Sequence, residues 1–211
     1  MGLLRAVADV VIVGSGTLKA DPRHVWTPDD ICPELTDDYR QLRMALHKCA
    51  VPLNVIVTGS GRIDMRLPVF TSGRVRTLVV TTVSGAKHLR KQKTPRWLKI
   101  RAIPHCRDRI PPSSILAVVG RMNVGKRILI EGGPQLLGEF YERRLVDEQF
   151  LTLAPQIAGR EYGDARISLV MGQAFQPGNT RWGTLTDVRR SANHLFLRYT
   201  FRSTIKDGPP P

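Results

Sequence analysis

Apolar and polar segments alternate along the chain with the spacing of strands and helices in an α/β protein. Continuous aliphatic runs at 10–13, 53–58 and 76–82 predict strands that are buried on both faces. A further strand is expected over 127–131, directly before two glycines. Residues 98–103 alternate between apolar and basic side chains, which is typical of a half-exposed strand.

Helices are predicted between these strands. Thr36, followed by two aspartates, has the pattern of a helix start, and that helix would run to about Lys48. A second helix begins after Pro111-Pro112, and a third covers 135–144. Residues 14–17 are expected to form a tight turn.

Two proline-containing stretches and the last third of the chain complete the pattern. Residues 21–35 are expected to be irregular, and over 83–97 Pro95 is expected to break any helix. A strand is predicted over 146–154, followed by an antiparallel pair at 182–190 and 194–202.

This order of elements predicts an α/β fold. Its central sheet would be mixed but mostly parallel, with helices on both faces and a C-terminal antiparallel hairpin. Residues 1–204 are interpreted as a single domain and 205–211 as a flexible tail.

The charge is concentrated in the middle of the chain. The formal net charge is +14, and residues 61–130 alone hold 16 basic and 2 acidic residues. Seven of the bases lie between Lys87 and Arg101, with Trp97 as the only aromatic residue among them. Single-strand binders place several aromatic platforms beside their charge, so nucleic acid is an unlikely partner, although the surplus is larger than one phosphate requires.

Cysteine content and hydropathy indicate the compartment. Three cysteines cannot build a disulfide framework and suit a reducing cytoplasm. No apolar run approaches the roughly 20 residues that a membrane helix needs. The five histidines show no ligand spacing with one another or with cysteine, so no metal site is expected.

Three glycine motifs are candidates for ligand binding. Gly120 to Arg127 imitates a phosphate loop, but Arg127 replaces the hydroxyl residue and the order is helix, loop, strand. We interpret it as a polar turn. Gly14-Ser15-Gly16-Thr17 lacks the third glycine of a dinucleotide fingerprint, because position 19 is Lys19. Its glycines either form a plain turn or let the backbone approach a ligand.

Glu131-Gly132-Gly133-Pro134 is more informative. It joins a buried strand to a helix, and paired glycines leave backbone amides open to an anion at the helix start. A sharp strand-to-helix turn is the structural alternative. Glu131 would lie beside any ligand bound there.

Taken in order, these motifs resemble a known family. Gly14 to Pro22 resembles the G-x-G-T-x-x-x-D-P segment of the pyrimidine reductase domain of riboflavin biosynthesis. Residues 128–137, then 145–148, 153–155 and 158–159, resemble that domain's second signature. The resemblance covers about residues 3–202. It implies a dihydrofolate-reductase-like three-layer fold, NADPH as hydride donor, a ribosylamino-pyrimidine substrate and a homodimer.

The resemblance also implies site residues, while the catalytic residue stays unknown. Glu131 is expected to face the substrate, and Arg23 or His24 to replace a missing family arginine. Arg62 is the expected partner of the NADPH 2′-phosphate. The residues expected to contact the cofactor are Gly14, Gly16, Thr17, Asp21, Thr58, Gly59, Arg62, Thr82, Gly132, Gly133, Pro134, Gln135, Leu136 and Leu137.

Two departures from the family pattern leave alternatives open. The family's first strand, which ends in Ser-x-Asp-Gly, has no counterpart in this sequence. We expect another segment or a partner chain to take its place, or activity to be weak. The substrate-phosphate segment is altered after Asp21. The alternatives are an NADPH reductase of another small substrate, or a catalytically silent relative that binds a cofactor or nucleic acid.

Overall fold

The structure is a computed structural model, which describes residues 1–95, 97–104, 109–157, 159, 161 and 168–201. Its contacts divide the chain into two compact units, Met1–Gly133 and Pro134–Pro211, and each is described here by itself. The single domain over 1–204 stays a prediction. The expected tail at 205–211 lies outside the described residues, and so do His105 and Cys106, one of the five histidines and one of the three cysteines.

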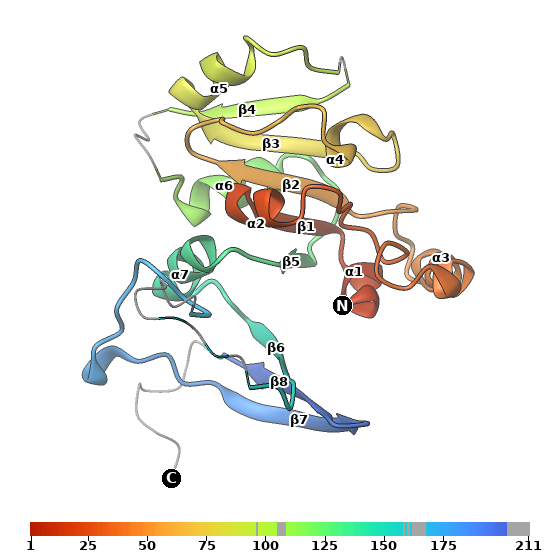
Figure 1. Cartoon of the computed structure of the whole chain (residues 1–211), viewed down its shortest axis with the longest axis vertical. Helices are drawn as coiled ribbons and strands as arrows, with labels where there is room; N and C mark the ends of the chain where they lie inside the picture. The colour runs from red at the N-terminus through yellow and green to blue at the C-terminus, as the bar shows by residue number, and fades with distance from the viewer. Residues whose placement is uncertain (96, 105–108, 158, 160, 162–167, 202–211) are drawn as a thin grey trace. The chain divides into compact units, whose positions relative to one another are not determined.

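The first unit is built on a parallel sheet of five strands, with the order β4-β3-β2-β1-β5 (Figure 1). The α/β class and the parallel sheet are confirmed. The elements in chain order are α1 (Gly2–Val7), β1 (Val10–Gly14), α2 (Ser15–Ala20), η1 (Pro33–Leu35), α3 (Thr36–Ala45), β2 (Leu53–Thr58), α4 (Pro68–Thr71), β3 (Thr77–Thr82), α5 (Val83–Leu89), β4 (Lys99–Ile103), α6 (Pro112–Gly120) and β5 (Ile128–Ile130).

The strand order reverses between β1 and β5. From β1 to β4 the chain adds each strand on the same side, and it then returns through α6 to place β5 on the other side of β1. Right-handed crossovers in opposite directions put their helices on opposite faces of the sheet. Figure 1 accordingly shows α2 in front of the strands and α6 behind them. Ligands of open α/β sheets bind outside the carboxyl ends of strands at such a reversal.

Burial of the strands explains why these sequences form the centre of the sheet. Every residue of β2 and β3 is buried, as are the four residues of β1 before Gly14. Val11, Val13, Ile56 and Val79 point into one apolar cluster, so the residues between them face the other side. A strand that is covered on both faces needs apolar residues at successive positions, which is the pattern seen in the sequence.

A buried arginine ties the end of α1 to α3 and to the loop before β2. Arg43 on α3 is 1% exposed, and its Nη1 donates to the carbonyls of Arg5, Ala6 and Ala8 at 3.2, 2.9 and 2.8 Å. Its Nε donates to the Cys49 carbonyl at 2.6 Å. Burial lowers the pKa of Arg43. These bonds satisfy the carbonyls at the end of a six-residue helix that is too short to be stable alone.

The second unit contains an antiparallel sheet of its own. Its elements are α7 (Pro134–Glu142), β6 (Glu148–Leu153), η2 (Pro177–Asn179), β7 (Thr184–Ser191) and β8 (His194–Thr200). The sheet order is β6-β8-β7, so the predicted C-terminal hairpin is confirmed and pairs with β6. The expected mixed sheet is thus divided into a parallel and an antiparallel one.

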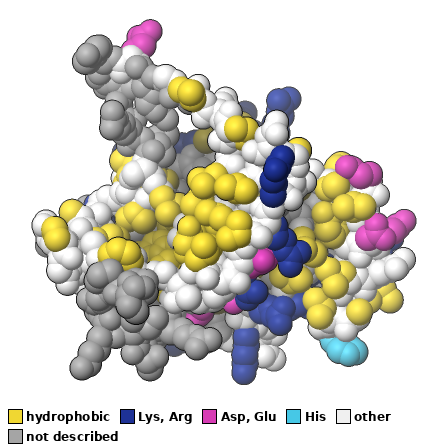
Figure 2. Space-filling model, turned by 90° about the horizontal axis from the view of Figure 1, so that it is seen from below, with side chains coloured by type: hydrophobic (Ala, Val, Ile, Leu, Met, Phe, Trp, Pro, Cys, Tyr) yellow, Lys and Arg dark blue, Asp and Glu magenta, His cyan; other side chains and the backbone are white. Residues whose placement is uncertain are grey.

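One face of this second sheet is apolar. The register sets Leu151 opposite Leu197 and Val188 opposite Leu197, which places all three on the same face. Neighbouring positions of that face include Leu153 and Leu185, which are 47% and 49% exposed. Figure 2 views the molecule from below relative to Figure 1, and hydrophobic side chains are gathered on the face that it shows. The homodimer stays a prediction.

Three local predictions were wrong. Residues 14–17 do not form a turn, because Gly14 is the extended N-cap of α2 and the helix begins at Ser15. Residues 83–97 do contain a helix, α5, which ends at Leu89 before Pro95 can interrupt it. Its start is fixed by Thr82, whose side chain accepts a hydrogen bond from the amide of Gly85. The helix expected to reach Lys48 ends at Ala45, since His47 adopts a positive φ of 53°.

Candidate functional site

The predicted cofactor segments of the first unit meet at one edge of its sheet. β1 ends at Gly14, β2 at Thr58, β3 at Thr82 and β5 at Ile130. Because these strands are parallel, their carboxyl ends lie at the same edge. β1 and β5 are neighbours there, with Ile12 opposite Ile130 in the register. The segments after β1 and β5 are therefore side by side at the point where the strand order reverses.

Glycines allow these two segments to approach closely. The amide of Gly14 donates to the carbonyl of Gly132 at 2.8 Å, and a Cβ on Gly14 would lie 3.3 Å from the nitrogen of Gly133. Gly132 has a φ of +127°, in a region that side chains rarely adopt, and a Cβ there would lie 3.1 Å from Thr17 Oγ1. Gly14, Thr17, Gly132 and Gly133, four of the predicted cofactor residues, are thus brought together.

Hydrogen-bond donors remain available in this group. The amides of Gly132 and Gly133 donate to no other described residue, and neither does the Thr17 hydroxyl. The neighbouring amide of Glu131, by contrast, is used within the sheet and donates to Ile12 at 3.0 Å. Unpaired backbone amides beside a strand end are suited to phosphate or carboxylate oxygens.

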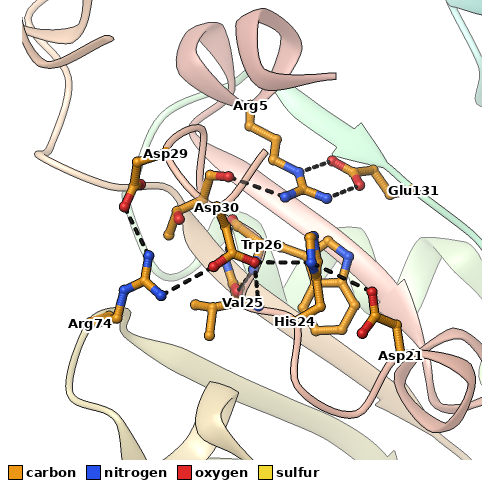
Figure 3. Close-up of polar contacts among 11 residues, drawn as sticks. Arg5, Asp21, His24, Val25, Trp26, Asp29, Asp30, Arg74 and Glu131 are labelled. Atoms are coloured by element: carbon orange, nitrogen blue, oxygen red, sulfur yellow. Dashed lines mark hydrogen bonds and ion pairs between the residues drawn. The ribbon is translucent and has the colours of Figure 1, made fainter. Parts of the chain in front are cut away.

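A buried ion pair holds the carboxylate at the end of β5 (Figure 3). Arg5 Nε and Nη2 donate to the two oxygens of Glu131, each at 2.6 Å, and their side chains are only 3% and 7% exposed. Arg5 Nη1 donates to the Thr27 carbonyl at 3.1 Å. A carboxylate has about four lone-pair sites, so this two-pronged contact leaves acceptor capacity on Glu131.

Arg5 was not among the residues singled out from the sequence. The signal was nevertheless present, since α1 has the sequence GLLRAV and Arg5 is its only charged residue. A charged side chain within an apolar helix is usually paired when it is buried. The partner, Glu131, lies 126 positions away in the sequence and could not be identified by spacing.

The threonines predicted after β2 and β3 hold loops in place. Thr58 is 2% exposed and its hydroxyl accepts from the amide of Gly61 at 3.1 Å. Thr82 is fully buried; its hydroxyl donates to the Gly59 carbonyl at 2.7 Å and accepts from Gly85 at 3.0 Å. These contacts join the loop after β2 to the start of α5. A direct cofactor contact by Thr58, Gly59 or Thr82 stays a prediction.

His24 belongs to a network of charged residues rather than standing free for a substrate (Figure 3). Its Nδ1 lies 2.9 Å from Asp30 Oδ2 and 3.6 Å from Asp21 Oδ2. Asp30 also accepts from the Val25 amide at 3.0 Å and from Arg74 at 3.1 Å. The His24 ring meets Trp26 edge-on, with the ring centroids 5.2 Å apart.

The remaining predicted residues are dispersed. Arg23 is exposed, and so is Arg62, which lies in the loop after β2. Asp21 is the C-cap of α2, and its side chain is 61% exposed. Gly16 has open space where a Cβ would be, so the fold does not require glycine there. The residues Pro134, Gln135, Leu136 and Leu137 form the first turn of α7 in the second unit.

The segment that imitates a phosphate loop is filled by the protein itself. A Cβ on Gly125 would lie 2.2 Å from Cγ of Asp9, and the amide of Arg127 donates to Asp9 Oδ2 at 2.9 Å. Asp9 is also paired with Lys48 at 2.6 Å. A carboxylate thus occupies the place that a phosphate would take, and the polar turn between α6 and β5 is confirmed.

The described residues contain neither a membrane-spanning helix nor a cluster of metal-ligating side chains. None of their helices has the length and hydropathy needed to cross a bilayer. No three or more of their His, Cys, Asp and Glu side chains are grouped as a metal ion would require.

Comparison with known proteins gives the family and the fold. The RibD C-terminal domain family matches residues 1–187. The chain is 28% identical to the 2,5-diamino-6-ribosylamino-4(3H)-pyrimidinone 5′-phosphate reductase of Archaeoglobus fulgidus over 160 residues. This aligned region covers 74% of this chain and 66% of that protein.

Solved structures agree with this fold. A pyrimidine reductase-like protein from Corynebacterium diphtheriae superimposes with a TM-score of 0.73 at 21% identity, covering 98% of this chain and 79% of that one. The riboflavin biosynthesis reductase of Saccharomyces cerevisiae gives a TM-score of 0.62 at 15% identity, covering 95% and 78%. The dihydrofolate-reductase-like fold expected from the sequence is confirmed.

Proposed function

Because the chain belongs to the RibD C-terminal domain family, we propose that it is an NADPH-dependent reductase of a ribosylamino-pyrimidine. The proposal names a cofactor and a substrate class beyond the family itself. It is supported by the relative from Archaeoglobus fulgidus, whose name states a reductase activity on such a compound.

The observation that carries the proposal is the set of unused hydrogen-bond donors in the segments after β1 and β5. The amides of Gly132 and Gly133, together with the Thr17 hydroxyl, make no hydrogen bond to another described residue. They lie at the carboxyl edge where the strand order reverses. This donor set suits the oxygens of a pyrophosphate, so these residues fit NADPH and would hold its phosphates.

The reaction divides between the cofactor and the chain. NADPH supplies the hydride when it is bound. The chain's part is to bind and orient, and Glu131 would accept hydrogen bonds from donors of the pyrimidine. Arg5 fixes the Glu131 carboxylate in one orientation, with both oxygens engaged at 2.6 Å. An orientation fixed before the substrate binds lowers the entropy lost on binding.

Preference for NADPH over NADH requires a cation for the 2′-phosphate. Arg62 is exposed in the loop after β2, at the same edge of the sheet. Its guanidinium can bind a phosphate through two parallel hydrogen bonds. Arg62→Ala is therefore expected to reduce the ratio of NADPH to NADH affinity.

A second candidate is a reductase of another small substrate. It is favoured by the contacts of His24, whose Nδ1 is engaged by Asp30 at 2.9 Å. A residue held in this way is less available as a substitute for the missing phosphate ligand of the family. The substrate need not then carry a ribose phosphate.

Direct binding and turnover measurements test these proposals. NADPH and NADH are titrated by fluorescence, and NADPH oxidation is followed with the ribosylamino-pyrimidine 5′-phosphate or with its dephosphorylated form. We expect micromolar NADPH binding, weaker NADH binding and oxidation with the phosphorylated compound. Oxidation with neither compound would reject the pyrimidine substrate, and the absence of binding by either nucleotide would reject the reductase.

A further inference from the structure

A pocket lies at the opposite end of the parallel sheet from the candidate site. Its volume is about 670 Å³, within the range of roughly 300–1,000 Å³ that is typical of small-molecule sites. Leu53, Thr77 and Lys99, the first residues of β2, β3 and β4, line it together with the loops that precede them. All of its lining residues belong to the first unit.

The walls of the pocket combine apolar surface with an exposed aromatic ring. Aliphatic side chains and Met122 contribute to the lining. Trp97 lines it as well and is 63% exposed, which is unusual for so large an apolar side chain. A tryptophan face that is open to a pocket offers a stacking surface to a flat ring.

Among the described residues, the charged side chains that line the pocket are all cations. Arg74, Arg76 and Lys99 line it, and no described Asp or Glu does. Arg74 is neutralised by Asp29 and Asp30, at 2.8 and 3.1 Å. Arg76 and Lys99, by contrast, form no ion pair or side-chain hydrogen bond with another described residue, so two positive charges remain for a ligand.

We propose that this pocket binds a small aromatic anion, a flat ring system that carries one acidic group. The ring would stack on Trp97 and lie against the aliphatic wall, while the acidic group would meet Arg76 and Lys99. Arginine and lysine bind such groups through charge-assisted hydrogen bonds. Lys99 belongs to the surplus of bases between Lys87 and Arg101, and the site gives that residue a role.

The pocket is separate from the candidate cofactor site. β2 and β3 have six residues each, and at about 3.3 Å per residue they keep the two ends of the sheet about 17–20 Å apart. Ligands at the two ends should therefore bind without displacing each other. The proposal does not depend on the reductase activity.

The test compares two probes that share one ring skeleton. One is 8-anilinonaphthalene-1-sulfonate, an aromatic anion, and the other is N-phenyl-1-naphthylamine, which lacks the sulfonate. Binding of each to the full chain is followed by probe fluorescence in the presence of saturating NADPH. The double variant Arg76→Gln with Lys99→Gln is expected to bind the anionic probe about tenfold more weakly. Its affinity for the neutral probe should stay within twofold of that of the unsubstituted protein.

A matched pair of substitutions controls for general charge. Arg90→Gln with Lys91→Gln removes the same charge from exposed residues outside the lining, and should leave both probes unchanged. If both double variants bound the anionic probe equally weakly, the proposal would be overturned, because the attraction between probe and protein would then be non-specific. Displacement of the anionic probe by NADPH would overturn it too, since the probe would then occupy the cofactor site.

Cysteine labelling gives a second, independent measurement. Cys49 is exposed and lines the pocket, whereas Cys32 does not line it. The anionic probe is expected to slow alkylation of Cys49 severalfold without changing the rate at Cys32, as measured by peptide mass spectrometry. An unchanged rate at Cys49 under saturating probe would contradict the assignment.

Discussion

The turns at the two ends of β5 each contain a glycine beside a carboxylate that is paired with a base, but they differ in the hydrogen bonds of their backbone amides. At the turn before β5, Asp9, the residue directly before β1, lies against Gly125 and pairs with Lys48 at 2.6 Å. Directly after β5, Glu131 pairs with Arg5 at 2.6 Å, next to Gly132. The first carboxylate also accepts from the amide of Arg127 and fills its glycine turn. At the second end the amides of Gly132 and Gly133 stay unpaired with described residues.

Under the proposed function, this difference separates a structural glycine turn from one that binds a ligand. Both turns have a glycine with positive φ, +117° at Gly125 and +127° at Gly132. What separates them is whether the protein supplies its own anion. We infer that the turn before β5 serves stability and the turn after it serves binding.

The largest expected effect follows from breaking the pair after β5. Arg5→Met leaves the Glu131 carboxylate buried without its cation, and removing one partner of a buried pair lowers the free energy of unfolding by about 3–5 kcal/mol. Adding Glu131→Met to Arg5→Met should restore most of the lost free energy of unfolding, because no unpaired charge then remains buried. Urea unfolding of both variants measures this, and a loss below about 1 kcal/mol in Arg5→Met would mean that the pair is not buried in solution.

The next effect concerns the turn before β5. Gly125→Ala places a Cβ 2.2 Å from Asp9 Cγ at a positive φ, and should lower the free energy of unfolding by about 2–4 kcal/mol. Gly73→Ala is the matched control, because its φ is also positive, +70°, but its Cβ would meet open space. We expect Gly73→Ala to lower the free energy of unfolding by about 1 kcal/mol. Equal losses would show that backbone strain alone is responsible.

The pH dependence of stability gives a third comparison. Burial raises the pKa of the Asp9 carboxyl, but hydrogen bonds from Lys48 and the Arg127 amide outweigh it and hold the pKa below the usual 3.8. A carboxyl whose pKa is lowered in the folded state stabilises the fold at pH values above its unfolded pKa. This stabilisation is lost as the pH falls through the pKa of the folded state.

Asp9→Asn should therefore lower the free energy of unfolding by about 1–3 kcal/mol at pH 7. The difference from the unsubstituted protein should shrink as the pH is lowered below about 4. Thermal unfolding across this range is the measurement. A difference that stays constant down to pH 2 would show that the Asp9 charge is not involved.

The smallest effect on stability is expected at Thr17. Thr17→Val keeps the shape and removes a hydroxyl that hydrogen-bonds to no other described residue, so the free energy of unfolding should change by less than about 0.5 kcal/mol. NADPH affinity should fall about fivefold to tenfold. Thr58→Val is the control, since its hydroxyl binds the Gly61 amide; there stability should change more than affinity.

The sequence predicted the sheet better than its connections. The aliphatic runs of β1, β2 and β3 are buried on both faces, and such runs are distinctive. The helix α2 was missed because two glycines within four residues favour a turn, yet the helix begins directly at Ser15. The short helix α5 was missed because the capping contact of Thr82 with Gly85 depends on where the strand ends.

The site shows a similar division. Gly14, Thr17, Gly132 and Gly133 carry sequence signals and are neighbours in the structure. Arg5 was missed because its partner is remote in sequence. The hydroxyls of Thr58 and Thr82 turned out to hold loops, which no spacing rule could have distinguished from ligand contacts.

The central claim, that the turn after β5 binds the cofactor while the turn before it does not, is tested by NADPH affinity in Gly132→Ala and Gly125→Ala. Both variants are titrated at a temperature where circular dichroism shows them folded. The account predicts at least a tenfold loss of affinity in Gly132→Ala and a change below twofold in Gly125→Ala. Equal affinities in the two variants, or a larger loss in Gly125→Ala, would contradict it.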